Sequence, residues 1–327
     1  MAASTLPASE RGLDGAPNGT AGGRVISYVL AFLGALANAM GNTLNRKASR
    51  DESAQVQFRL KMFADLVHRP AWLSAIGLMT VSFLLASAAL GTGQLASVQL
   101  VIVLELPLTL IGGSVLLGAR LGVRDWAAIA VMTGGVIGLL ALLNPRPGPS
   151  TTVAPTLWIL GSAANGGSVL VLYLAARAHP RPATRAALLG IGAGFSYGLT
   201  AAFTKGMADQ FNEGGISAVF SSWELYACVG AGLVSVWLLQ NAYEAGPLTA
   251  SQPGITLVDP IISTLWGVVV FGEQVNQGAL LALTPLPLIA VAAGAVVLSR
   301  SLVLHVTQTG RDQAEEGRRP DLAGAGS

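Results

Sequence analysis

Two acidic residues occupy the middle of long apolar stretches, where a charge is costly. Glu105 lies near the centre of residues 95–117, and Asp259 lies near the centre of residues 248–271. Placing an ionised side chain at the centre of a lipid bilayer costs about 2.5–3.5 kcal/mol on insertion scales. An acid retained there could exchange protons or bind a cation, which makes both residues candidate substrate or ion-coupling sites. The alternative is that each carboxyl bonds to a hydroxyl or an amide and holds neighbouring helices together.

Amide and hydroxyl side chains add polar groups to stretches of the same kind. Asn38, Asn42 and Asn45 recur at helical spacing, so they lie on one face of a helix. An amide gains nothing from facing lipid, so this face is predicted to point into the protein. It either lines a polar pathway or bonds to neighbouring helices. The other candidates of this kind are Gln99, Gln252, Tyr197, Thr200 and Asn165.

Three prolines interrupt the two stretches that carry the acids. Pro107 and Pro260 each follow one of the acids within two residues. Because proline has no backbone N–H, each frees the carbonyl four residues earlier, such as that of Val103. The freed carbonyl is available to a ligand, or the proline simply kinks the helix. Pro253 adds a second break to residues 248–271, so that stretch is predicted to be the discontinuous one.

The composition of the chain indicates that lipid is its solvent. Apolar residues make up 52% of the 327 residues and charged residues only 11%, whereas soluble domains carry about 25% charged residues. The net charge of +2 leaves no electrostatic footprint for nucleic-acid binding. The single cysteine, Cys228, excludes a disulfide within the chain. Because the sequence has neither a P-loop nor a clustered catalytic motif, we expect neither an enzyme nor a cofactor.

A helix needs about 20 mostly apolar residues to cross the hydrocarbon core, and nine stretches meet this requirement. The sequence therefore predicts an all-α integral membrane protein of about nine transmembrane helices. Residues 1–24 and 301–327 are predicted to be polar tails, the first of them disordered. Residues 56–67 are predicted to form an amphipathic helix, on the membrane surface or against the bundle. The nine stretches are Val25–Asn45, Ala71–Leu90, Leu95–Leu117, Val123–Leu143, Thr156–Ala176, Ala186–Ala208, Trp223–Leu239, Leu248–Phe271 and Ala279–Leu298.

The basic residues are divided unevenly between the two sides that nine crossings create. Most of the 19 lysine and arginine residues fall in the loops after the first, third, fifth and last stretches. Basic loops stay in the cytoplasm, so we expect the N-terminus outside, the C-terminus in the cytoplasm and the chain in the plasma membrane. Lys47 and Lys205 end the first and sixth stretches, and their side chains are expected to extend to the lipid headgroups.

The two halves of the sequence repeat one another. Residues 89–117 align without a gap on residues 242–270. Residues 25–143 are thus one four-helix unit, residues 156–176 a connector helix and residues 184–300 a second unit. Five helices precede the second unit, so it enters the membrane in the opposite direction. Inverted repeats are typical of alternating-access carriers, which bind their substrate near the midplane. Matched positions include Gly93 with Gly246, Gln99 with Gln252 and Pro107 with Pro260.

Regularly spaced glycines predict close contacts between helices. Gly190, Gly194 and Gly198 recur at every fourth residue, and Gly134 and Gly138 have the same spacing. Small residues four apart let membrane helices approach one another closely. We therefore interpret these glycines as packing faces.

Several short motifs occur at the ends of the predicted helices. They are Asn45-Arg46-Lys47, Arg69-Pro70-Ala71-Trp72, Gly272-Glu273 and the glycine-rich fourth and ninth stretches. These motifs resemble those of the drug/metabolite transporter superfamily. The resemblance extends over about residues 25–300 and includes EamA-like members and, through the nine-helix arrangement, NIPA-like members. It implies transport, because NIPA-like members are implicated in magnesium transport and other members export metabolites, amino acids or drugs. Glu105 stands where the family is generally apolar or small, which leaves the substrate open.

The sequence as a whole predicts a secondary transporter of a small polar solute, with proton-coupled export as the first choice. Divalent cation transport, chiefly of magnesium, is the second, and a non-transport assembly or sensor subunit is the alternative from another class. The expected partners are the bilayer and a small-molecule or cation substrate, with a homodimer left open. No metal ligands are assigned. The predicted substrate or coupling residues are Glu105, Asp259, Asn38, Asn42, Gln99, Gln252 and Tyr197, and the predicted helix breaks are Pro107, Pro253 and Pro260.

Overall fold

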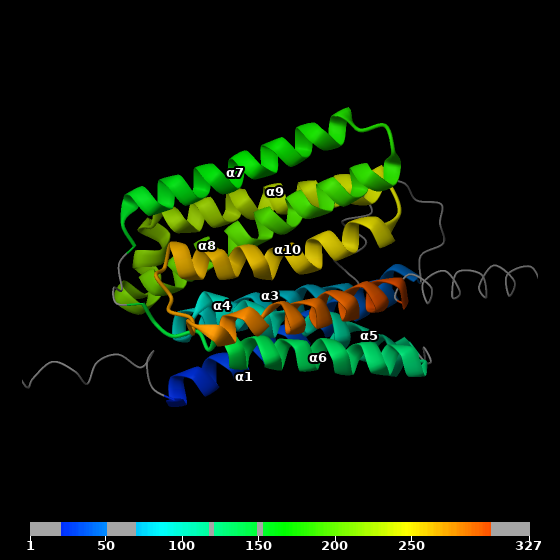
Figure 1. The fold of residues 1–327 in the computed structure, drawn as a ribbon, viewed down its shortest axis with the longest axis horizontal. Helices are drawn as coiled ribbons and strands as arrows, with labels where there is room; N and C mark the ends of the chain where they lie inside the picture. Colours follow the sequence, from blue (N-terminus) through cyan, green and yellow to red (C-terminus); the bar gives the residue numbers. More distant parts are fainter. Residues whose placement is uncertain (1–20, 51–69, 118–120, 149–152, 302–327) are drawn as a thin grey trace, which may run out of the picture.

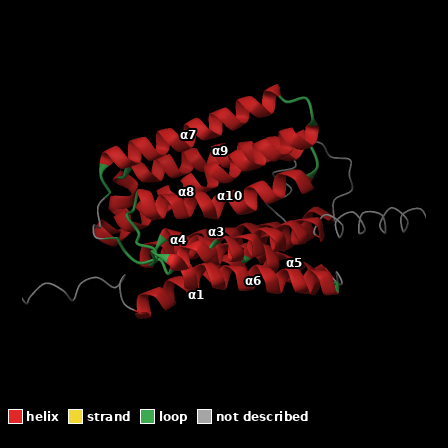
Figure 2. Cartoon of the chain, viewed as in Figure 1, coloured by secondary structure: helices red, strands yellow, loops and turns green. Residues whose placement is uncertain are grey.

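The computed structural model describes residues 21–50, 70–117, 121–148 and 153–301. These residues form helices joined by short connections, and they contain no strand (Figure 2). The predictions for residues 1–20, for the helix of residues 56–67 and for the tail after residue 301 fall outside the described residues, as does the side chain of Lys47.

The helices follow the apolar stretches closely. Three of them begin with proline, at Pro70, Pro155 and Pro182, because the fixed φ of proline suits a first helical turn, where its missing N–H would have no partner. A last helix covers residues 285–301. In chain order the other elements are α1 (Ala21–Arg50), α3 (Pro70–Thr92), α4 (Leu95–Ile102), α5 (Glu105–Leu117), α6 (Val123–Leu143), α7 (Pro155–Ala178), α8 (Pro182–Ser221), α9 (Trp223–Ala245), α10 (Leu248–Val269) and the short 3-10 helix η2 (Ala279–Leu283).

Eight segments of the described chain are long and apolar enough to cross a membrane. One of them joins α4 and α5 as Leu95–Val115, and another joins η2 and the last helix as Ala279–Ser301. The outer surface of the bundle is apolar, and Leu160, Val171 and Leu233 each expose about two thirds of their surface. Since exposed apolar surface of this kind requires lipid around it, the chain is an all-α multi-pass membrane protein, as the sequence predicts.

The structure breaks the third predicted stretch. Between α4 and α5, the N–H of Leu104 donates to the carbonyl of Val101 at 3.0 Å, and that of Leu106 donates to Val103 at 3.3 Å. These are tight three-residue turns. Pro107 explains them, because its ring would clash in a regular helix with the carbonyl of the residue four positions earlier, Val103. The Val103 carbonyl accepts the hydrogen bond from the N–H of Leu106, so the prediction that this carbonyl is left free is wrong.

The eighth predicted stretch, by contrast, is one continuous helix. α10 contains both Pro253 and Pro260, so the prediction that this stretch is discontinuous is also wrong. The hydroxyl of Thr264 donates to the carbonyl of Pro260 at 2.7 Å, and α8 packs against the helix. α10 is long enough to cross a membrane, but its polar residues and prolines keep it out of the apolar group of eight.

The helices form two layers, which Figure 1 shows one above the other. The first layer contains α1, α3, α4, α5 and α6, together with the orange helix of residues 285–301. The second layer contains α7, α8, α9 and α10. The layers contact one another mainly through α4 with α10 and through α3 with α8. The last helix therefore returns from the second layer to the first.

Glycines permit the closest helix contacts, as the sequence predicts for α8. A Cβ atom at Gly194 or Gly198 would lie 2.7 Å from a side chain of α10, which is too close for any larger residue. In α6, a Cβ at Gly135 would lie 2.8 Å from the last helix, whereas one at Gly134 would meet nothing. The packing face of α6 is therefore Gly135 with Gly138, and the prediction of Gly134 is wrong.

Candidate functional site

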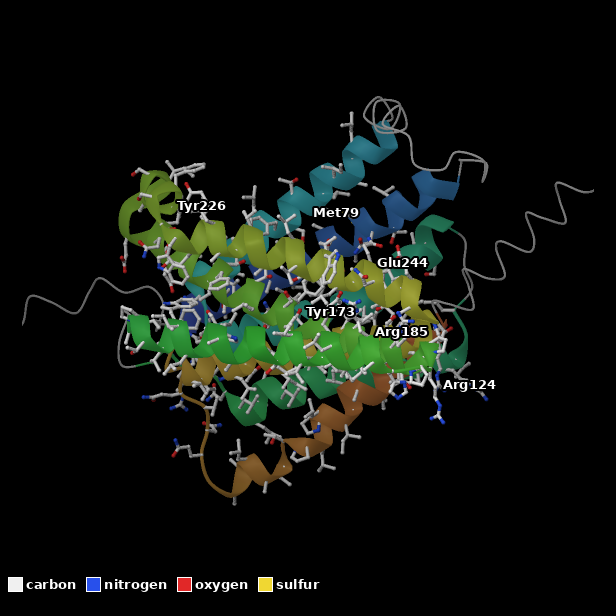
Figure 3. All side chains as sticks on the ribbon, turned by 90° about the horizontal axis from the view of Figure 1, so that it is seen from above. Met79, Arg124, Tyr173, Arg185, Tyr226 and Glu244 are labelled. Carbon is white, nitrogen blue, oxygen red and sulfur yellow. The ribbon has the colours of Figure 1, made fainter. Side chains whose placement is uncertain are left out.

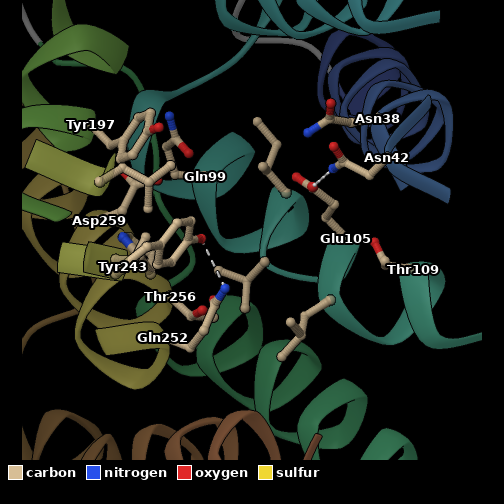
Figure 4. Close-up of a pocket in the computed structure, with 16 residues that line it drawn as sticks. Asn38, Asn42, Gln99, Glu105, Thr109, Tyr197, Tyr243, Gln252, Thr256 and Asp259 are labelled. Carbon is tan, nitrogen blue, oxygen red and sulfur yellow. Dashed lines mark hydrogen bonds between the residues drawn. The ribbon is translucent and has the colours of Figure 1, made fainter. Parts of the chain in front are cut away.

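A cavity of about 490 Å³ lies between the two layers. α1, α4 and α5 supply one wall and α8, α9 and α10 supply the other (Figure 4). The lining residues are Asn38, Asn42, Gln99, Ile102, Val103, Glu105, Leu106, Thr109, Tyr197, Leu239, Tyr243, Gln252, Ile255, Thr256, Asp259 and Pro260.

The cavity brings together all seven predicted substrate or coupling residues. They come from five helices and are spread over more than 200 positions of the chain, from Asn38 to Asp259. Pro260 also lines the cavity, whereas Pro107 and Pro253 do not contribute to it. The role of the seven polar residues in binding stays a prediction, but their position around one cavity is a property of the fold.

Glu105 enters the cavity because the helix breaks directly before it. It is the first residue of α5, where the helix dipole favours a negative charge. The amide of Asn42 donates a hydrogen bond to its carboxyl at 3.0 Å, and Asn38 lies on the same wall (Figure 4). The face of α1 that carries Asn38 and Asn42 thus points into the bundle, and Asn42 contacts Glu105.

Asp259 faces the cavity from the opposite wall, on α10. The hydroxyl of Ser263, one turn later, donates to its carboxyl at 3.1 Å. Thr256, one turn earlier, lines the same wall. Asp259 therefore has one neighbouring donor, whereas Glu105 has two, the amides of Asn42 and Asn38. Both carboxyls line the cavity.

Four further polar side chains complete the walls. Gln252 donates to the Tyr243 hydroxyl at 3.0 Å (Figure 4). Gln99 and Tyr197 also line the cavity, and Gln99 exposes only 6% of its surface. The arrangement thus offers carboxyls, amides, phenols and hydroxyls around a space the size of a small-molecule site.

Three polar lining residues, Tyr243, Thr109 and Thr256, are not predicted from the sequence. Tyr243 is missed because α9 extends to Ala245, beyond the predicted end of the seventh stretch at Leu239. The sequence did contain a signal for Tyr243, because this residue lies within the aligned repeat, residues 242–270. The two threonines carry no signal of their own, because threonine hydroxyls are common in membrane helices, where they bond to the preceding turn.

Two weaker candidates lie elsewhere. The Thr200 hydroxyl donates to the carbonyl of Ser196 within α8 at 2.9 Å and lies 3.3 Å from the Ser235 hydroxyl of α9. Asn165 lies between α8 and α10, and with its amide oriented to satisfy both neighbours it donates to the Phe195 carbonyl and accepts from the Trp266 ring N–H, each at 3.2 Å. Both residues hold helices together rather than line the cavity.

Lys205 does not extend to the headgroups. α8 continues for 16 residues beyond it, to Ser221 with a break at Gly215, so Lys205 is not at a helix end. Its side chain is buried and its ammonium group binds the Asp209 carboxylate at 2.6 Å. The prediction is wrong because an internal partner replaces the lipid headgroups.

Glu273 closes one end of the space between the layers. It exposes 5% of its surface and accepts hydrogen bonds from the N–H groups of Leu95 and Ala96 at the start of α4. Beside it, Arg146 and Gln274 exchange two backbone hydrogen bonds of 2.8 and 3.0 Å. We call these five residues the closed end, and it joins loops and helices of both layers.

Burial changes the acidity of Glu273, which lies in the loop after α10. Desolvation raises its pKa to about 7, and the two N–H groups and the Lys205 ammonium, which lower it, only partly offset that effect. The Asp209 carboxylate adds a smaller upward contribution to the pKa. Within the described residues, no group of three His, Cys, Asp or Glu side chains could hold a metal ion.

Comparisons with known proteins give one relative without an assigned activity. An uncharacterized protein of Corynebacterium glutamicum is 29% identical to this chain over 211 residues, which cover 63% of this chain and 70% of the relative. No family model matches the chain, and no solved structure matches it. The resemblance to the drug/metabolite transporter superfamily therefore stays a prediction.

Proposed function

We propose that the protein is a secondary transporter that moves a small solute across the plasma membrane by alternating access. The observation that carries this proposal is the cavity between the layers, which holds Glu105 and Asp259 on opposite walls. Two acids are costly within apolar helices, and a lining that leaves both of them facing open space supports a binding role. Proton exchange at these acids would couple transport to the proton gradient.

The helix contacts support an inverted repeat of nine crossings, with α10 as the eighth. α1 packs against α3 and against α4 and α5, and α8 packs in the same way against α9 and α10. The proposed counterparts also meet each other, α4 with α10 and α6 with residues 285–301. Two four-helix units related by a twofold axis would produce this pattern, with α7 as the connector. Carriers with such repeats bind substrate at the interface between the units.

The distribution of charge supports the proposed orientation. Arg124 and Arg185 lie at one end of the bundle (Figure 3), and α1 begins at the opposite end (Figure 1). Because basic residues favour the cytoplasmic side, the start of α1 and the closed end face the outside in this proposal. Transport then requires the closed end to open.

Alternating access can be tested without knowing the substrate. Cys228 is the single cysteine, so Cys228→Ala gives a background without thiols. In it, Thr256→Cys places one thiol in the cavity, and Gln274→Cys, as the matched control, places one on the exposed surface of the closed end. Each protein is labelled with a membrane-impermeant cationic thiol reagent in right-side-out and in inside-out vesicles.

The expected result is that the Thr256→Cys thiol reacts from both sides of the membrane, because a carrier exposes its cavity to each side in turn. The Gln274→Cys thiol is expected to react from one side only. Reaction of the cavity thiol from a single side, or from neither, would overturn the proposal in favour of a non-transport membrane subunit.

A further inference from the structure

The charges of the cavity all have the same sign. Glu105 and Asp259 are the ionisable carboxyls among its lining residues, and the lining contains no lysine, arginine or histidine. The buried Lys205 is paired with Asp209 and lies outside the lining. A ligand with a positive charge is attracted from both walls, whereas an anion would have no partner of opposite charge there.

Polar groups that line the cavity without a protein partner also point to a ligand. Gln99 and Thr109 expose 6% and 7% of their surface and line the cavity. Within the part of the chain that the structure describes, neither side chain makes a hydrogen bond. Because an amide or hydroxyl normally finds a hydrogen-bond partner, these two groups are placed to bond to whatever fills the cavity.

The remaining lining is apolar and aromatic. Tyr197 and Tyr243 bring two phenol rings to the cavity, and the face of an aromatic ring attracts a cation. A hydrated ion gains no favourable contact from apolar walls, whereas an organic ligand can pack its apolar part against them. The apolar lining residues are Ile102, Val103, Leu106, Leu239, Ile255 and Pro260.

Magnesium fits this lining poorly. It requires near-octahedral oxygen ligands at about 2.0–2.1 Å and keeps several of its waters. The two carboxyls come from opposite walls of a cavity of about 490 Å³, and the described residues contain no third acid or histidine grouped with them. The volume is that of a site for an organic molecule.

We infer that the substrate is a small organic cation, in which one ammonium group lies between Glu105 and Asp259 and an apolar body contacts the tyrosines and aliphatic side chains. This inference rests on the proposed transport function and adds the chemical class of the solute. A cation and protons compete for the same two carboxyls, so release of bound protons makes room for the cation. The other titratable groups that face this site are the phenols of Tyr197 and Tyr243.

The test is equilibrium binding to the full-length protein in lipid nanodiscs at pH 8. The probes share a phenyl ring and differ in charge: phenethylamine as the cation, 2-phenylethanol as the neutral analogue and 3-phenylpropionate as the anion. Tetraethylammonium and methylammonium extend the cation series in size, and magnesium chloride is measured alone. The variants are Glu105→Gln, Asp259→Asn and, as the matched control, Glu244→Gln, an exposed acid on α9 outside the lining.

At least one cation is expected to bind about tenfold or more tighter than the neutral and anionic probes. Asp259→Asn and Glu105→Gln should each weaken that binding about tenfold or more, while Glu244→Gln leaves it unchanged. Lowering the pH to 5.5 should weaken binding to the wild type.

Three results would overturn the inference: equal or tighter binding of the neutral or anionic probe, binding of magnesium in preference to the amines, or no binding of any cation. If the cavity thiol still reacts from both sides of the membrane in that case, the transport function stands and only the substrate class is wrong.

Discussion

The cavity and the closed end lie along the same two helices, α4 and α10, but they bury their acids in different ways. Glu273 is enclosed by the backbone N–H groups at the start of α4. Asp259 has one side-chain donor, Ser263, and Glu105 has the amides of Asn42 and Asn38, and both carboxyls line the cavity. An acid satisfied by the backbone holds two layers together, whereas an acid facing a cavity is available to a ligand.

The hydrogen bonds of the two regions also run in different directions. At the closed end they join the layers, as Glu273 does with α4 and as Asn212 of α8 does with the Gly91 carbonyl of α3 at 2.7 Å. Around the cavity, the bond from Asn42 to Glu105 stays within the first layer and that from Gln252 to Tyr243 within the second. The bonds at and near the closed end therefore hold the two layers together, and the proposed transport cycle would require them to break.

An aromatic cluster lies near the closed end, within the second layer. Trp158 of α7 contacts Phe203, Trp223, Trp266 and Phe271, with ring centroids 5.2–5.6 Å apart. Aromatic pairs of this kind contribute about 0.5–1.5 kcal/mol each beyond their buried area.

The largest expected effect comes from locking the closed end. In the Cys228→Ala background, Arg146→Cys with Gln274→Cys places two thiols at a hydrogen-bonded antiparallel pair, where the Cα atoms lie about 5.5 Å apart, within the range of a disulfide. Oxidation is expected to abolish uptake of a labelled amine such as phenethylamine by proteoliposomes, and reduction to restore it. The two single-cysteine variants, oxidised in the same way, are the controls. Uptake that survives complete cross-linking would show that the closed end does not open during transport.

An intermediate effect is expected from removing the Glu273 carboxyl. Glu273→Ala leaves two buried N–H groups without a partner, at about 1–3 kcal/mol each, so thermal unfolding in detergent should begin at a clearly lower temperature. Asp259→Asn, at the cavity, should change the unfolding temperature much less because an amide can still accept the bond from Ser263. Gln274→Ala, at the exposed neighbour, is the matched control. Equal destabilisation by Asp259→Asn would remove the distinction between the two regions.

The smallest effect is the pH dependence that Glu273 gives to folding. Its pKa is about 7 in the folded protein and near 4.5 when unfolded, so between these values the folded state binds more protons. Its contribution to stability is therefore greatest below pH 4.5, falls as the pH rises and levels off above pH 7. The unfolding temperature of the wild type should thus drop from pH 5 to pH 8 by more than that of Glu273→Gln. An equal drop in both proteins would mean that Glu273 does not titrate in this window.

Much of the architecture is predictable from the sequence because the bilayer imposes it. Eight of the nine predicted stretches correspond to apolar helices long enough to cross. Their ends shift by a few residues at most, apart from α8, which continues to Ser221, and α9, which continues to Ala245. Those two extensions were missed because hydropathy marks where a helix leaves the hydrocarbon and not where its hydrogen bonds end.

The candidate site was predictable for a related reason. Polar side chains such as Asn42, Gln99 and Asp259 cannot face lipid cheaply, so their presence in apolar stretches is itself a signal. Lys205 shows the limit of this reasoning. Its ion pair with Asp209 makes burial possible, and a hydropathy profile carries no information about which side chains pair. The prolines show another limit. Pro107 breaks its helix and Pro260 does not. The extensive contact between α8 and α10 supports α10, and this contact cannot be read from the sequence.

The sequence by itself determined the solvent of this protein, the approximate limits of its apolar helices and most of the polar residues that turn inward, because each of these follows from the cost of exposing charge and backbone to lipid. Only the tertiary structure decided that Glu105 and Asp259 share one cavity, that Glu273 is bound to the start of α4 and that residues 285–301 pack on α6. Those facts depend on which helix lies beside which, and helix–helix contacts in a membrane are set by close packing and a few hydrogen bonds rather than by hydropathy.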